Sequence, residues 1–309
     1  MQVEQELAAF APDRETVLTV GVFDGVHLGH RHLLDYLKRQ ASAGDYLAGV
    51  VTFIQHPLEV LSPQTRLVRL TTLEERASLI REQGIDLVVP LSFTAELAQL
   101  SARDFVSLLL HHLKMRGLVV GPDFALGKGR EGDAFRLHEL GKELGFWVEV
   151  VTPRLVDGEV ASSTNIRQAL ARGDVTTVRR LLGRPYALVG PVGRGEERGR
   201  LLGFPTANLQ VNSGQALPGD GVYATRAYLG NRSFLSVTNI GTRPTFGEGQ
   251  RTVEVYLLGF DGGLYGEQLR LELVERLRPE KRFSSPEELT AQIRRDVDQA
   301  VSALTRADP

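Results

Sequence analysis

Cysteine is absent from the 309 residues of this chain. The absence excludes disulfides, thiolate zinc sites, iron–sulfur clusters and cysteine nucleophiles, and it fits a reducing cytoplasm. Long apolar runs are absent too, since none approaches the roughly 20 residues of a membrane span. Glu4 and Glu6 precede any apolar stretch, which is not the pattern of a secretory signal. We therefore expect a cytoplasmic protein with no membrane partner.

The chain also lacks an excess of charge of either sign. Its 36 basic and 38 acidic side chains give a net charge of −2. This balance argues against nucleic acid as the main partner, although it permits a local basic pocket for a phosphorylated small molecule. The apolar content of 42% and the charged content of 24% exclude intrinsic disorder. The length suggests two domains.

Short apolar runs alternate with helical patterns in the first half of the chain. The expected strands are 16–23, 48–53, 87–91, a fourth that starts at 118–120, and 147–151, and the expected helices are 29–43, 73–83, 102–113 and 133–144. Because helices of about 10–15 residues separate the strands, the pattern predicts an α/β domain with a parallel sheet and helices on both faces.

The pattern changes near Asn165. Two short helices, 164–171 and 175–182, are followed by expected strands at 186–192, 221–229, 232–240, 251–258 and 268–277 and by a final helix at 286–305. Gly- and Pro-rich turns between short alternating runs are typical of a small antiparallel β-barrel, here with a terminal helix. We expect the two domains to be 1–183 and 184–309.

The first candidate site is the segment 19–31, TVGVFDGVHLGHR. His27 and His30 stand where a helix begins after a buried strand, and glycines there allow a close approach of a ligand. A helix N-terminus suits phosphate, and fixed imidazole donors stabilise the charge that phosphate oxygens gain in a transition state. Alternatives are simple caps or packing, and a zinc site with His56. Nucleotide or phosphate contacts are expected at Gly21, Phe23, Asp24, Gly25 and Gly29.

The second candidate site is the segment 189–209, VGPVGRGEERGRLLGFPTANL. Gly190, Gly193 and Gly195 predict a mobile loop between strands that does not fit a Walker A motif. Thr206 and Asn208 offer two hard oxygen ligands on one side of an extended segment. That suits Mg²⁺ with nucleotide phosphates. The alternative is a turn with ordinary polar capping.

His-x-Gly-His after a buried strand resembles the nucleotidylyltransferase superfamily, which has a Rossmann-like fold. Residues 161–167, ASSTNIR, look like the late phosphate-binding motif of its flavin-specific branch. The resemblance implies that Ser163 and Thr164 cap the following helix and that Arg167 reaches a triphosphate. The alternative is an N-cap beside a solvent-exposed arginine.

Two further segments resemble the same branch. TFIQHP at 52–57 has Gln55 where proline is usual, and GPDFALGKGREG at 121–132 has Leu126 where an aromatic residue is usual. For Phe124, core packing is the alternative to ligand contact. The resemblance implies substrate contacts at His56, Pro57, Asp123 and Phe124.

Four segments of the second half occur in the order found in riboflavin kinases. They are GFPTANL at 203–209, PGDGVYA at 218–224, VTNIGTRPTFG at 237–247 and TVEVYLLGFDGGLYG at 252–266. Nearly the whole chain thus resembles the prokaryotic bifunctional riboflavin kinase/FAD synthetase family, which implies that Glu254 is the base for the riboflavin hydroxyl. Tyr256 stands where histidine is common, and Gly259 and Gly263 where aspartates are common.

The resemblance implies two ATP-dependent steps that need Mg²⁺, with riboflavin, FMN and FAD as substrates or products. Three alternatives remain at this point. A tRNA-directed enzyme of the same fold would need a basic face, a related nucleotidylyltransferase would act on another substrate, and a flavin-binding regulator would have no turnover. The sequence predicts no particular oligomeric state.

Overall fold

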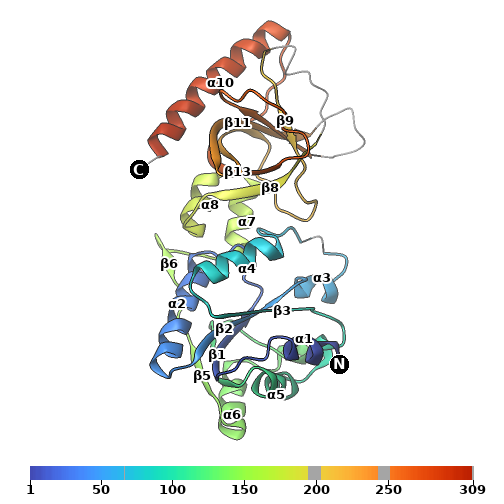
Figure 1. Cartoon of the computed structure of the whole chain (residues 1–309), viewed down its shortest axis with the longest axis vertical. Helices are drawn as coiled ribbons and strands as arrows, with labels where there is room; N and C mark the ends of the chain where they lie inside the picture. The colour runs from blue at the N-terminus through green and yellow to red at the C-terminus, as the bar shows by residue number, and fades with distance from the viewer. Residues whose placement is uncertain (66, 194–202, 243–250, 308–309) are drawn as a thin grey trace. The chain divides into compact units, whose positions relative to one another are not determined.

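The computed structural model describes residues 1–65, 67–193, 203–242 and 251–307 (Figure 1). The chain divides into two compact units, Met1–Ser163 and Thr164–Pro309. Helices α7 (Ser163–Ala171) and α8 (Val175–Leu182) lie largely in the second unit. They do so because α8 packs on β8 and β13 of the barrel described below.

The first unit is built on a parallel five-stranded sheet in the order β3-β2-β1-β4-β5. Its strands are β1 (Thr16–Gly21), β2 (Leu47–Phe53), β3 (Leu87–Leu91), β4 (Met115–Val120) and β5 (Trp147–Val150). The expected parallel sheet is confirmed, although β4 begins three residues before the expected position.

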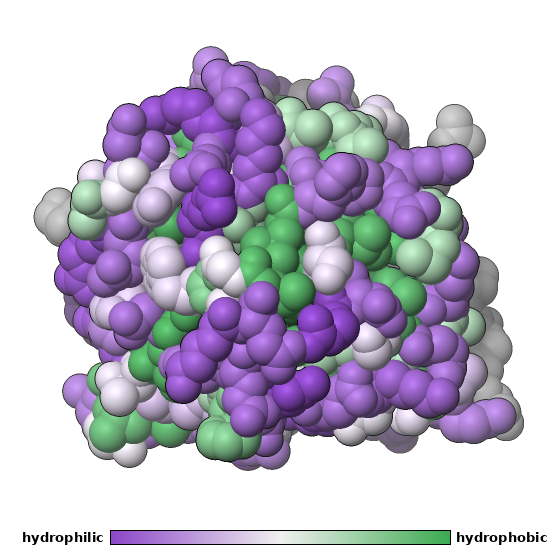
Figure 2. All heavy atoms as spheres, turned by 90° about the horizontal axis from the view of Figure 1, so that it is seen from below, coloured by the Kyte–Doolittle hydropathy of each residue, from purple (hydrophilic) through white to green (hydrophobic). Residues whose placement is uncertain are grey.

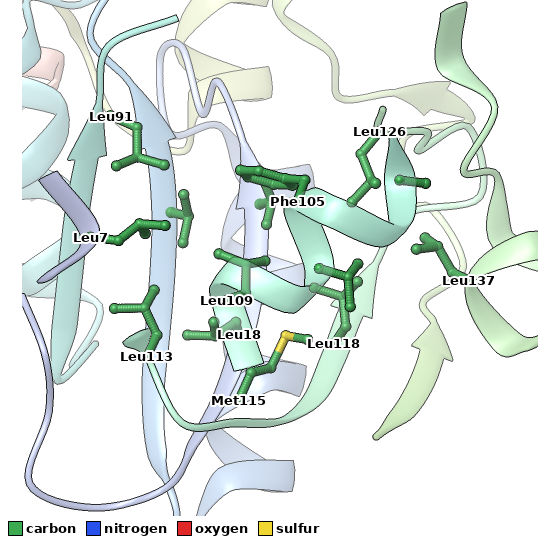
Figure 3. Close-up of a cluster of buried hydrophobic side chains, with 14 of the residues drawn as sticks. Leu7, Leu18, Leu91, Phe105, Leu109, Leu113, Met115, Leu118, Leu126 and Leu137 are labelled. Atoms are coloured by element: carbon green, nitrogen blue, oxygen red, sulfur yellow. The ribbon is translucent and has the colours of Figure 1, made fainter. Parts of the chain in front are cut away.

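Helices cover both faces of this sheet, as expected. They are α1 (Gln2–Ala8), α5 (Ala102–His112) and α6 (Ala134–Leu144) on one face, and α2 (Leu28–Ala43) and α4 (Leu73–Glu82) on the other. Successive strand residues alternate between the two faces. Leu18 joins the cluster under α1, α5 and α6, whereas Val17 joins the cluster under α2 and α4. Figure 3 shows part of the first cluster, where Leu7, Leu109 and Leu137 of three helices gather beside the sheet.

Several short elements were not expected from the sequence. Helix α1 buries Val3 and Leu7 within only seven residues, too few for a periodic pattern to stand out. The other short elements are α3 (Pro57–Leu61), the 3₁₀ turns η1 (Leu97–Gln99) and η2 (Lys128–Arg130), and a two-stranded ribbon of β6 (Leu155–Val156) and β7 (Glu159–Val160).

The second unit contains a closed antiparallel barrel in the strand order β10-β11-β12-β9-β8-β13, which confirms the expected barrel. The strands are β8 (Tyr186–Gly193), β9 (Ala207–Leu209), β10 (Gly221–Leu229), β11 (Arg232–Thr242), β12 (Arg251–Leu257) and β13 (Gln268–Arg278). The terminal helix α10 (Pro286–Ala307) packs on the outside of β10, β11 and β13 (Figure 1). Ala300 and Leu304 of α10 meet Val222 and Ala224 of β10 there.

Three hydroxyl groups are buried inside the barrel between β10 and β11. The Thr225 hydroxyl lies 2.7 Å from the hydroxyls of both Ser236 and Thr238, and all three residues are fully buried. The Ser236 hydroxyl also donates to the Thr225 carbonyl at 2.9 Å. This hydroxyl trio satisfies its own polar atoms and links the two strands in one register.

Polar residues dominate the face seen in the space-filling view, with hydrophobic residues in smaller groups between them (Figure 2). Within the described part of the chain, no helix is both long enough and apolar enough to span a bilayer.

Candidate active sites

The first site lies where the strand order of the parallel sheet reverses. The chain leaves β1 toward β2 on one side, while β4 pairs with the other side of β1. Ligands of open α/β sheets bind outside the carboxyl ends of the strands at such a point. The segment Val22–His27 follows β1 and the segment 121–132 follows β4, so two motifs singled out from the sequence belong to this edge.

The segment after β1 has an unusual backbone. Phe23, Gly25 and Val26 have φ angles of +53°, +83° and +38°. This region is open to glycine but costly for a β-branched residue such as Val26. Such a conformation persists only where the surroundings hold it.

Asp24 supplies part of that support. Its carboxylate is buried and accepts hydrogen bonds from the backbone N–H groups of Leu70 (2.9 Å) and Thr71 (3.0 Å) and from the Thr71 hydroxyl (3.1 Å). The Gly25 N–H donates to the same hydroxyl at 3.1 Å. Asp24 therefore holds the loop to the segment before α4, and its expected contact with nucleotide stays a prediction.

His27 and His30 stand together at the start of α2. His27 is the N-cap, and its Nδ1 accepts from the His30 backbone N–H at 3.2 Å. Because Nδ1 accepts, the proton of a neutral His27 ring is assigned to Nε2, which is then a donor. The two rings are stacked with centroids 3.6 Å apart, and the Phe23 ring lies 5.0 Å from that of His30.

The late motif reaches this loop at Ala161 and Ser163. A Cβ on Gly29 would lie 2.6 Å from the Ala161 carbonyl and 3.1 Å from the His27 ring, so only glycine fits. A Cβ on Gly21 would similarly lie 3.1 Å from the Phe23 ring.

Ser163 does not act as the expected cap. Helix α7 already begins at Ser163, and its hydroxyl instead donates to the Asp24 carbonyl at 2.9 Å. Thr164 lies inside the first turn of α7, so the capping expectation was wrong for it too. Arg167 follows one turn later, and its contact with a triphosphate stays a prediction.

The edge after β2 is shaped by Gln55, His56 and Pro57. His56 caps α3, since its Nδ1 accepts from the Leu58 N–H at 3.1 Å, and Pro57 is the first helical residue. Gln55 accepts from the Phe93 N–H at 3.1 Å, a bond that proline could not make. Among the described residues there is no group of three His, Cys, Asp or Glu side chains that could hold a metal ion.

The segment after β4 combines an exposed residue with buried ones. Asp123 is exposed, and its carbonyl accepts from Arg130 Nη2 at 2.8 Å. Phe124 is half-buried against the core under α5 and α6. It therefore contributes to core packing, which was the alternative to ligand contact, and part of its surface stays exposed. Leu126 lies in that core and pairs with Gly132, which explains why an aliphatic residue is accommodated there.

The second site lies on the outer face of the barrel. In β12, Val253 and Val255 are buried, whereas Glu254 between them is half-exposed. The strand register sets Glu254 opposite Asn208 of β9 on one side and opposite Asn239 of β11 on the other. Directly opposed side chains share a face, with Cβ atoms about 5 Å apart. We call this line of side chains the Asn208–Glu254–Asn239 row.

Neighbouring residues extend the row. Thr206 is two residues before Asn208 and half-exposed like it, so both are on the outer face. Tyr256 is two residues after Glu254, and its ring meets the Phe204 ring edge-on at 5.5 Å. Tyrosine in place of the usual histidine therefore packs against the GFPTANL segment.

Asn239 and Glu280 are additions that the sequence analysis missed. The Asn239 amide donates to Glu280 Oε1 at 3.5 Å. Burial raises the pKa of the Glu280 carboxyl, and this hydrogen bond acts in the opposite direction. Asn239 lies within the quoted VTNIG motif, where a polar residue between two buried positions was an available signal.

The glycines of the second motif have a different position from the one expected. Gly190 and Gly193 lie in strand β8, not in a loop, so that prediction was wrong. A Cβ on Gly190 would lie 2.1 Å from the Gln210 carbonyl, and one on Gly193 would lie 2.3 Å from the Gln210 amide. The lack of a side chain at both glycines thus leaves room for Gln210, which directly follows β9. Gly195 lies outside the described residues.

Two glycines replace the usual aspartates after β12. Gly259 has a φ of +68°, which favours glycine, and Gly263 has open space around its Cβ position. Neither belongs to the Asn208–Glu254–Asn239 row.

Comparison with known proteins matches each unit separately. Residues 10–165 match the family model for FAD synthetase, and residues 182–304 match that for riboflavin kinase. The chain is 41% identical over 288 residues to the bifunctional riboflavin kinase/FMN adenylyltransferase of Escherichia coli (strain K12), which covers 93% of this chain and 92% of that protein. The chain belongs to this bifunctional family.

Other members of the riboflavin kinase/FMN adenylyltransferase family are similarly close. The Pseudomonas fluorescens enzyme is 39% identical over 300 residues and covers 96% of both chains, and the Listeria monocytogenes enzyme is 36% identical over 288 residues with 92% and 91% coverage. A crystal structure described as a macrolide-efflux protein from Streptococcus pneumoniae has a TM-score of 0.89 at 27% identity and covers 96% of both chains.

Membership assigns the activities to the two halves of the chain. The α/β half carries the FAD synthetase, and the barrel half carries the riboflavin kinase. ATP, riboflavin, FMN and FAD are the substrates and products of these activities. These matches favour the bifunctional enzyme over two of the alternatives, a tRNA-directed enzyme with a basic face and a flavin-binding regulator without turnover.

Proposed function

We propose that the stacked His27/His30 pair is the centre of FMN adenylylation. In this reaction a phosphate oxygen of FMN attacks the α-phosphorus of ATP, the bond to the β-phosphate breaks, and pyrophosphate leaves. The substrate is its own nucleophile, so the protein needs to supply only orientation and charge stabilisation.

The geometry of the pair supports this role. The hydrogen bond to His27 Nδ1 makes Nε2 the donor, and both rings stand at the N-terminus of α2. Backbone N–H groups and the helix dipole at that end favour the negative charge of a phosphate. We propose further contacts to the nucleotide at Gly21, Phe23, Gly25, Gly29, Ser163, Thr164 and Arg167, and to the flavin at His56, Pro57, Asp123 and Phe124.

We propose that Glu254 is the general base of the kinase reaction. The ribityl 5′-hydroxyl of riboflavin attacks the γ-phosphorus of ATP, ADP leaves, and the hydroxyl proton passes to the Glu254 carboxylate. The register that sets Glu254 between Asn208 and Asn239 is the observation that supports this assignment. Two amides beside the carboxylate can orient it without adding charge.

The residues near Glu254 suit a magnesium ion held mainly by nucleotide. Thr206 and Asn208 offer neutral oxygen ligands on one face, and Mg²⁺ bound with phosphates needs few protein ligands. Magnesium would neutralise the charge of the transferred phosphate. We also propose that the backbone of Gly193, which is paired with Asn208 in the strand register, lies close to the bound nucleotide.

One product analysis tests both assignments. Purified chain is incubated with riboflavin, ATP and Mg²⁺, and the flavins are separated by chromatography. We expect FMN and FAD, and a chelator should abolish both. If only FMN forms, the proposed adenylylation site is wrong. If neither FMN nor FAD forms, the whole proposal is overturned.

A further inference from the structure

The segment Leu70–Arg76, which runs into the first turn of α4, contacts the loop that carries the histidines. Leu70 and Thr71 hold the Asp24 carboxylate and the Gly25 N–H, as described above. Thr72 caps α4 by accepting from the Glu75 N–H at 3.2 Å. The sequence analysis gave this segment no role.

Arg76 makes two further contacts of this segment. Its Nη1 donates to the Val22 carbonyl at 2.8 Å, and its Nη2 donates to the Phe53 carbonyl at 2.6 Å. Val22 directly follows β1, and Phe53 is the last residue of β2. One guanidinium therefore joins the carboxyl ends of two neighbouring strands. A planar fork with several donors can do this, whereas an ammonium is a single point of charge.

The burial of Arg76 needs an explanation beyond stability. Only 3% of the residue is exposed. Burial lowers the pKa of its guanidinium, and the negative charge of Asp24 acts in the opposite direction. Replacing buried ionic groups by apolar ones is often neutral or stabilising, so a buried charge is weak evidence for a stabilising role. Arg76 is better explained by the two carbonyls that it fixes.

The loop that Arg76 contacts has a strained backbone conformation that needs support from its surroundings. Phe23 and Val26 have positive φ angles, and His27 follows at once as the cap of α2. A displacement of about 1 Å at a reacting group costs up to about 10²-fold in rate.

We propose that Arg76 is a positioning residue of the adenylylation site. By clamping the Val22 and Phe53 carbonyls it holds the Phe23–His27 loop, and through it the His27/His30 pair, in the geometry that the transition state needs. Arg76 itself contacts no substrate. This inference rests on the proposed role of the two histidines.

The test compares Arg76→Met and Arg76→Lys in the full chain, with FMN adenylylation and riboflavin phosphorylation measured on the same preparations. We expect Arg76→Met to lower kcat for FAD formation by about 10²-fold and to leave KM for ATP within about threefold. Arg76→Lys, which reaches one carbonyl, should lose about 10-fold. Arg81→Met is the matched control, because Arg81 is exposed on the same helix.

Several outcomes would overturn the inference. They are a kcat within about threefold of the parent for folded Arg76→Met, a loss confined to KM, or an equal loss in Arg81→Met. A parallel fall of the kinase rate would also count against it, because a general folding defect lowers both activities.

Two further variants complete the test. If Arg76→Met does not fold, Thr71→Val and Arg76→Lys decide, since Thr71→Val removes the hydroxyl that bridges Asp24 and Gly25. We expect about a 10-fold loss of kcat for each, and less than about threefold in both would overturn the inference. His30→Ala in the same assay separates the two proposals. If His30→Ala forms FAD at the parent rate, the proposed adenylylation site is wrong. If His30→Ala loses this rate while the Arg76 variants keep it, the positioning role of Arg76 is wrong.

Discussion

The two units hold their candidate residues by different means. In the α/β unit, His27 and His30 follow a strand and depend on a loop with positive φ angles, which buried side chains far along the sequence hold in place. In the barrel, Glu254 and Asn208 lie on the strands themselves, and backbone pairing alone sets their spacing. The loop site should therefore respond to distant substitutions, whereas the strand site should respond chiefly to changes in its own residues.

Glu254→Gln should give the largest effect. The amide keeps the size and one acceptor oxygen of the carboxylate but takes up no proton, so FMN formation should fall by about 10²–10⁴-fold. ATP binding and adenylylation of added FMN should be unchanged. Single-turnover kinase assays at saturating riboflavin isolate the chemical step. A kinase rate within about threefold of the parent would make Glu254 an ordinary surface residue.

His30→Ala should break the other site alone. A fixed donor to developing negative charge contributes on the order of 10²–10³ in rate, so FAD formation from FMN should fall by that factor. Riboflavin phosphorylation in the same sample serves as the control. An unchanged rate of FAD formation would remove His30 from the chemistry.

Gly29→Ala sharpens the comparison without removing a functional group. Alanine has a higher helix propensity than glycine, so the substitution should not weaken α2 itself. Any loss of adenylylation rate then reflects the contact of the new Cβ with the Ala161 carbonyl and the His27 ring. We expect adenylylation to fall by about 10–10²-fold and the kinase to keep its rate. Gly263→Ala, where the added Cβ meets nothing within 4 Å, is the control. Equal rates in the two variants would contradict the tight fit at Gly29.

Fragments test how far the units are independent. We propose that a barrel fragment from Arg184 folds and makes FMN but not FAD. A fragment from Thr164 should melt about 10 °C higher, because α8 buries Val175, Val178, Leu181 and Leu182. Leu170 of α7 also accepts from the Gly219 N–H at 2.8 Å. Thermal melts and product analysis decide, and FAD from either fragment would contradict the assignment of reactions to domains.

The smallest effect concerns the start of α10. Hydrogen bonds from Ser284 and the ammonium of Lys281 lower the pKa of Glu288 to about 2. The ionised form is therefore favoured in the folded state, and its contribution is complete above the ordinary pKa of 4.5 and is lost as the pH falls toward 2. Glu288→Gln should lower Tm by about 1–2 °C at pH 7, and the difference should shrink below pH 4.5. A difference independent of pH would contradict this origin.

The sequence predicted what depends on local periodicity and missed what depends on distance. Alternating strands and helices indicated the parallel sheet, and the short runs after residue 186 indicated the barrel. The contacts of Arg76 join residues 54 and 23 positions apart, so no local pattern reveals them. Gly190 and Gly193 were assigned to a loop because glycine usually marks one, whereas close packing of Gln210 was the reason for both. The loop histidines were predicted because their motif is short and continuous.

The hydroxyl trio inside the barrel bears on how the chain selects one fold among near alternatives. A shift of β11 by one residue past β10 would turn Ser236 and Thr238 outward and bring Val237 and Asn239 inside. The three hydroxyls would then lose one another, and an amide would be buried without its neighbours. The same shift would move Asn239 away from Glu254. The buried register of the barrel thus also fixes its exterior: a chain that pairs its buried hydroxyls has also placed Asn239 opposite Glu254.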